Sequence, residues 1–125
     1  MKIAVLVARI LLGLMFLIFG LNGFLNFLHM PMPSGPAGQY MGVLFVSHYL
    51  WAILLVEIIG GVLLLSGQFI PLGLVLLGPV LFNILLFHAF LLPSGFPPAL
   101  LATLLWFIVF FGVRQAFAGI FVQKV

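Results

Sequence analysis

Four long apolar runs, separated by short breaks, dominate the pattern of hydrophobic and polar positions along the chain. A helix needs roughly 20 apolar residues to cross the ~30 Å hydrocarbon core of a bilayer, and each run is close to that length. The breaks are rich in proline, glycine and serine, which is typical of turns between helices. The pattern therefore predicts an all-α fold, a bundle of four transmembrane helices, with spans at about 3–28, 48–66, 71–92 and 98–116.

A shorter apolar segment lies between the first two spans. Residues 30–38 contain several prolines and glycines, a composition that interrupts a helix. Residues 39–46 are apolar again but too few to cross a bilayer. We expect 39–46 to form a short interfacial helix against the bundle, and the whole chain, 1–125, to form a single transmembrane domain.

The composition agrees with a membrane location. Of the 125 residues, 66% are hydrophobic and 4% are charged, whereas about a quarter of the residues in a soluble domain are charged. We therefore expect the lipid bilayer to surround the chain. Its few basic residues cannot form the clustered basic face of a nucleic-acid-binding protein. The absence of cysteine excludes disulfides, thiol catalysis and cysteine-bound iron–sulfur clusters.

The basic residues predict the orientation of the chain. Lys2, Arg9, Arg114 and Lys124 all lie near the two chain ends, and the loops expected on the other side carry none. Four spans place both termini on the same side of the membrane, and basic segments favour the cytoplasm. We expect a multi-pass protein of a bacterial-type cytoplasmic (inner) membrane with both termini in the cytoplasm.

Glu57, the only acidic residue, lies in the middle of the second span. A charged carboxylate at the bilayer centre costs about 3 kcal/mol, and the adjacent Gly60 and Gly61 allow a neighbouring helix to approach. We therefore expect Glu57 to point into the bundle. Two interpretations remain open: a proton donor or acceptor that could also anchor a cationic or hydroxylated lipophilic ligand, or a structural group in an inter-helix hydrogen bond or an ion pair with Arg9. Arg9 could equally extend to the interface.

Asn83 and His88 are the polar residues of the third span, which also contains Pro79. Pro79 should kink this helix and free a carbonyl near position 75. Asn83 and His88 could face inward and, with Glu57, hydrogen-bond a quinone carbonyl or a sterol hydroxyl. A neutral imidazole could also bind a tetrapyrrole metal or shuttle protons. The alternative is that both residues hold neighbouring helices together.

A second group of polar residues lies near the outer interface. Asn22, Asn26 and His29 follow one another at spacings of four and three, so they should share one helical face. His48 precedes the second span. We interpret these four residues as an interfacial polar stripe. The three histidines and one glutamate do not have metal-ligand spacing, and no Ser/His/Asp set or second carboxylate is present, so we assign neither a metal site nor catalytic residues.

Four segments, taken together, resemble the DoxX family of membrane proteins. They are R-I-L-L-G-L at 9–14, F-G-L-N-G-F-L-N-F at 19–27, E-I-I-G-G-V-L-L-L at 57–65 and P-V-L-F-N-I-L-L-F-H at 79–88. The resemblance covers nearly the whole chain and implies a compact four-helix bundle. The family name is tied to a subunit of a thiosulfate:quinone oxidoreductase, and other relatives are linked to membrane redox complexes. The wider grouping resembles sterol-isomerase and sterol-binding four-helix proteins, which use intramembrane carboxylates.

Two functions follow as hypotheses. The first is an accessory subunit that packs against other membrane subunits of a redox or electron-transfer complex, which could also bear a pigment. The second is a binder of, or an enzyme acting on, a quinone- or sterol-like molecule. Its ligand-binding or proton-active candidates are Glu57, His88, Asn83 and Arg9. Quinone and tetrapyrrole are the cofactors compatible with these residues, and the sequence selects neither.

Overall fold

The computed structural model describes residues 2–28, 32–120 and 122–123, and this part of the chain is helical and contains no strand. Four segments are long and apolar enough to cross a membrane, which confirms the expected four spans, and a short helix lies between the first and the second. The elements are α1 (Lys2–Leu25), α2 (Gly35–Val46), α3 (Tyr49–Ser66), α4 (Ile70–Phe90), the 3-10 helix η1 (Pro93–Gly95), α5 (Phe96–Gly112) and the 3-10 helix η2 (Arg114–Phe117).

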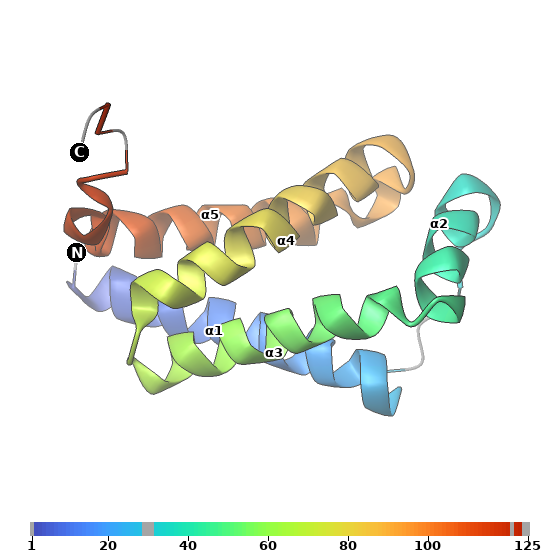
Figure 1. Cartoon of the computed structure of the whole chain (residues 1–125), viewed down its shortest axis with the longest axis horizontal. Helices are drawn as coiled ribbons and strands as arrows, with labels where there is room; N and C mark the ends of the chain where they lie inside the picture. Colours follow the sequence, from blue (N-terminus) through green and yellow to red (C-terminus); the bar gives the residue numbers. More distant parts are fainter. Residues whose placement is uncertain (1, 29–31, 121, 124–125) are drawn as a thin grey trace.

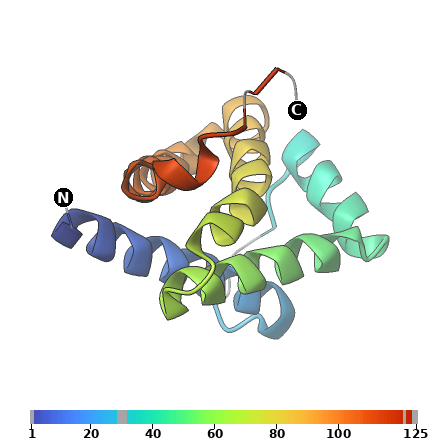
Figure 2. The same ribbon diagram turned by 60° about the vertical axis from the view of Figure 1, so that its left-hand side comes forward.

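The four long helices run alternately up and down, and each packs against two others. α1 contacts α3 and α5, and α4 contacts the same two helices, so the cyclic order is α1–α3–α4–α5. Figure 1 shows α1 and α3 as one pair and α4 and α5 as the other. We call the end where α1 begins and α5 finishes the termini end. The opposite end is the α2 end, because both views place α2 there, beside the start of α3 (Figures 1 and 2).

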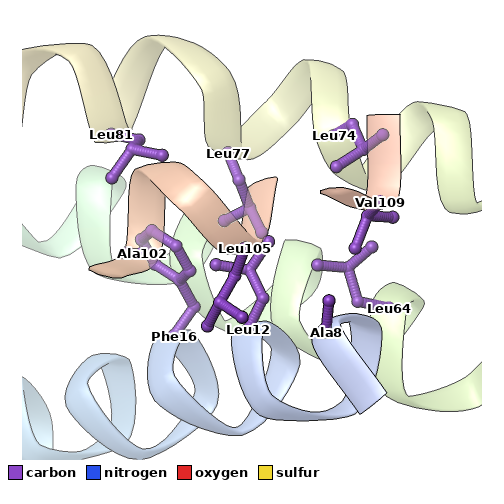
Figure 3. Close-up of a cluster of buried hydrophobic side chains, with 10 residues drawn as sticks. All are labelled: Ala8, Leu12, Phe16, Leu64, Leu74, Leu77, Leu81, Ala102, Leu105 and Val109. Carbon is purple, nitrogen blue, oxygen red and sulfur yellow. The ribbon is translucent and has the colours of Figure 1, made fainter. Parts of the chain in front are cut away.

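The apolar core joins all four long helices (Figure 3). Its members are Ala8, Leu12 and Phe16 of α1, Leu64 of α3, Leu74, Leu77 and Leu81 of α4, and Ala102, Leu105 and Val109 of α5. Large apolar side chains also cover the outside of the bundle; Ile3 and Phe90, for example, are each 79% exposed. Because lipid tails are as apolar as these side chains, close packing rather than exclusion from water must hold the helices together.

Glycines bring α1 and α3 into backbone contact. A Cβ atom built on Gly61 would lie 2.8 Å from the carbonyl oxygen of Gly13, and one built on Gly13 would lie 3.0 Å from the carbonyl oxygen of Gly61. Such distances are too short for any side chain, so only glycine permits this crossing. Close approach through small residues is the usual way in which transmembrane helices gain dispersion contacts.

The ends of three elements differ from the expected bounds. α2 begins at Gly35 rather than at residue 39, because Pro36 occupies the first turn, where a helix needs no N–H donor. α1 ends at Leu25 rather than at residue 28, and Asn26 follows in the left-handed conformation with φ 51°. α5 ends at Gly112 and the chain continues as the short helix η2 rather than as helix to residue 116.

Candidate functional site

Glu57 lies at the middle of the 18-residue helix α3 and is 8% exposed, so it points into the bundle as expected. Its side chain faces α1, where a Cβ atom built on Gly20 would lie 3.4 Å from the Glu57 Cβ. The glycine thus makes room for the carboxyl-bearing side chain at the α1–α3 interface.

The carboxyl group of Glu57 has no hydrogen-bond partner among the described residues. In the same part of the chain, no completely buried side-chain nitrogen or oxygen lacks a partner. Glu57 as a residue is 8% exposed, so it is not completely buried. A polar group inside a membrane bundle normally finds a partner, so Glu57 is the exception here.

Arg9 does not form the ion pair with Glu57 that one interpretation included as an alternative. Its Nη1 donates instead to the carbonyl oxygens of Leu64 and, at 3.3 Å, of Leu65. These carbonyls lie in the last turn of α3, about two turns beyond Glu57. The guanidinium also lies beside Gly67, the left-handed residue that ends the helix. Arg9 therefore caps the C-terminus of α3, where a cation complements the helix dipole.

Asn83 is exposed and faces α2 rather than the inside of the bundle, so the second alternative, a residue that holds neighbouring helices together, describes it better. Its Nδ2 donates to the hydroxyl oxygen of Tyr40 at 3.0 Å, and the Tyr40 ring lies 5.6 Å from the ring of Phe87. Tyr40 and Asn83 thus attach α2 to α4. Tyr40 was not among the predicted residues, although a tyrosine in a short apolar helix is typical of an interfacial anchor.

His88 fastens the end of α4 to the turn that follows it. Its Nδ1 lies 3.0 Å from the Leu92 carbonyl oxygen and donates to it, because a carbonyl oxygen can only accept. A Cβ atom on Gly95 would lie 2.2 Å from His88 Cε1, so this edge of the ring is packed against the turn. Gly95 thus leaves room for the imidazole ring beside the turn.

Within the described residues no hydrogen bond joins any two of Glu57, Asn83 and His88. Asn83 has its partner in α2 and His88 has its partner in the turn after α4, whereas Glu57 faces α1. The structure therefore does not link these three residues into one polar cluster.

The expected polar stripe is interrupted by the end of α1. Asn22 is buried and its Oδ1 accepts a hydrogen bond from the Leu28 N–H at 2.6 Å, whereas Asn26 is exposed and lies beyond the last helical residue. Asn22 and Asn26 therefore do not share a helical face. His29 lies outside the described residues, and His48 precedes α3 with φ 64° and its ring 4.4 Å from the ring of Trp51.

Trp106 provides a polar link between α4 and α5 that the sequence did not indicate. Its Nε1 donates to the Leu74 carbonyl oxygen at 3.1 Å, one residue from the carbonyl that Pro79 was expected to free. Gly78 leaves room for the indole, since a Cβ atom there would lie 3.5 Å from Trp106 Cζ2. The tryptophan thus links α5 to the part of α4 that precedes Pro79.

Neither of the two main hollows on the described surface, both shallow, is lined by Glu57, Asn83 or His88. One, of about 350 Å³, is an apolar groove between α4 and α5 around Pro79, Thr103 and Trp106. The other, of about 510 Å³, lies on α2 between Gln39 and Ser47. Neither hollow therefore offers a ligand cavity at the candidate residues.

These features define the class of the chain as a multi-pass integral membrane protein whose apolar helices fit a lipid bilayer. No protein-family model, no curated protein and no solved structure matches it.

Proposed function

We propose that this protein is an accessory subunit of a larger membrane assembly. The observation that carries the proposal is that four of its polar side chains serve its own fold. Arg9, His88 and Trp106 each donate to a backbone carbonyl, and Asn83 bonds to a side chain of α2. What remains is a small bundle with apolar outer faces, which suits packing against partner helices as well as against lipid.

The resemblance to the DoxX family supports a redox or electron-transfer complex as that assembly, because relatives are linked to such complexes. Lys2, Arg9 and Arg114 at the termini end support a bacterial-type inner membrane with both termini in the cytoplasm. A quinone-linked partner fits the same resemblance.

The alternative function is binding or conversion of a quinone- or sterol-like molecule. It required a shared site for Glu57, Asn83 and His88. Because Asn83 and His88 have partners of their own, only Glu57 is left to support it. The accessory function is therefore the better supported of the two.

The test is purification of the native protein in mild detergent, followed by mass spectrometry of the intact particle and an absorption spectrum. The proposal expects other membrane subunits in fixed stoichiometry, with flavin, haem or pigment absorbance contributed by the assembly. A chain that purifies alone and retains one lipophilic molecule would instead establish the alternative.

A further inference from the structure

Glu57, the only acidic side chain of the protein, has no cationic partner among the described residues. Arg9 is engaged at the last turn of α3, and Lys2 and Arg114 are exposed at the termini end. Arg114 donates to the Phe111 carbonyl oxygen in its own turn, at 3.1 Å. Within the described residues, Glu57 therefore has no counter-charge and no hydrogen-bond donor.

The position of Glu57 makes this lack costly. It lies at the middle of a transmembrane helix, where water and lipid head groups do not reach. An unpaired carboxyl group in hydrocarbon is unfavourable in its charged form and leaves hydrogen-bonding capacity unused in its neutral form. The residue is nevertheless 8% exposed, so it is not sealed off completely from the outside of the bundle.

We infer that Glu57 is a docking point for a positively charged, hydrogen-bond-donating side chain on a transmembrane helix of a partner subunit. This inference rests on the accessory function proposed above and names the contact through which the subunit is held. Complementary charge is the argument for the partner. Acidic residues within membranes usually pair with basic ones, and the part of the chain that the structure describes does not supply the base.

The surroundings of Glu57 favour a single inserted side chain over a bulky ligand. The neighbours of Glu57 on its face of α3 are all buried: Leu54, Gly60, Gly61 and Leu64. Neither the groove between α4 and α5 nor the hollow on α2 is lined by Glu57. An arginine or lysine head on a long, narrow stem needs far less space than a ring system does.

A defined peptide tests the inference without knowledge of the natural partner. The full-length chain is placed in phosphatidylcholine vesicles with a dansyl-labelled, leucine-rich transmembrane peptide that carries one central arginine. Energy transfer from the native tryptophans Trp51 and Trp106 reports association. The expected result is about fivefold to thirtyfold tighter association than for the same peptide with a central leucine.

Three variants locate the effect. Glu57→Leu should abolish the preference for the arginine peptide, and Glu57→Gln, which keeps the shape and an acceptor oxygen, should weaken it. Asn83→Leu is the matched control, because it removes an exposed polar group that already has a partner, and it should leave the preference unchanged. Thermal unfolding in detergent confirms that each variant is folded.

Equal association of both peptides with the unaltered chain would overturn the inference, as would a preference that survives Glu57→Leu. Glu57-dependent stabilisation of the chain by dodecylamine, without any preference for the arginine peptide, would overturn it in favour of a small lipophilic cation. The accessory function is judged separately. Native purification with partner subunits upholds that function even if the peptide test fails, and a solitary native chain rejects it whatever the peptide does.

Discussion

At the scale of single residues, backbone carbonyls are the main acceptors for polar side chains in this bundle. Arg9 reaches the last turn of α3, His88 the turn after α4, and Trp106 the segment of α4 before Pro79. At the end of α3, the carbonyls of Leu64 and Leu65 lack the N–H donors that they would have inside a regular helix. In a bilayer no water replaces those donors, so side chains must do so.

The cap formed by Arg9 predicts a loss of stability when it is removed. Arg9→Met keeps much of the apolar stem but leaves the carbonyls of Leu64 and Leu65 without their donor, and should lower the free energy of unfolding by about 1–2 kcal/mol. Arg9→Lys should recover part of this loss, because the ammonium keeps the charge near the helix end. Unfolding in mixed detergent micelles measures the effect.

Arg114→Met is the control for this experiment. Arg114 is exposed and bonds only within its own turn, so its replacement should change the free energy of unfolding by less than about 0.5 kcal/mol. Equal effects at the two positions would show that Arg9 does not act as a specific cap.

At the scale of helices, the contact between α1 and α3 depends on glycines that face each other across the interface. Gly13 and Gly61 bring the two backbones together. Gly20, about two turns after Gly13 in α1, accommodates Glu57. This helix pair carries the candidate residue, so the glycines also determine how the carboxyl group is presented. By contrast, α2 is attached to α4 mainly through Tyr40.

Gly61→Ala should therefore be strongly unfavourable. The new Cβ would lie 2.8 Å from the Gly13 carbonyl oxygen and 2.9 Å from the Leu17 nitrogen, both backbone atoms that cannot move aside. The helices must separate, at a cost of about 1–3 kcal/mol in the free energy of unfolding.

Gly42→Ala is the matched control in α2, because nothing lies within 4 Å of a Cβ atom at that position. It should be neutral or stabilise the fold by up to about 1 kcal/mol, since alanine is the better helix former. The two alanine variants are compared by thermal unfolding in the same detergent. A similar loss in both would contradict the close α1–α3 contact.

At the scale of the whole molecule, the two ends of the bundle differ in charge. The termini end carries Lys2, Arg9 and Arg114, whereas the described part of the α2 end carries no charged residue. The alternation of the helices places Gln68 at the termini end and Ser34 and Ser94 at the other end. This asymmetry predicts a single orientation in the membrane.

Cysteine labelling checks that orientation directly, because the chain has no native cysteine. In inside-out membrane vesicles, Lys2→Cys and Gln68→Cys should react with an impermeant maleimide. Ser34→Cys and Ser94→Cys should react only after the vesicles are opened; all four positions are exposed. Labelling of Gln68→Cys and Ser94→Cys from the same side would contradict the alternation of the helices.

The sequence by itself determined the number and approximate position of the spans, the short helix between the first two, and the inward orientation of Glu57. These features depend on local quantities. The length of an apolar run must match the bilayer, and the glycines beside Glu57 mark the face on which helices approach. Helix ends were less predictable because proline in a first turn, as at Pro36, is compatible with a helix start.

Only the tertiary structure decided which partner each polar side chain has. Asn83 turned toward Tyr40, His88 toward Leu92 and Arg9 toward the end of α3, and the ion pair of Arg9 with Glu57, one of the alternatives, did not form. The physical reason is that a hydrogen bond depends on the positions of two groups to within a few tenths of an ångström. Periodicity gives the face of a helix on which a residue lies, but not the carbonyl or hydroxyl that the neighbouring helix brings to it.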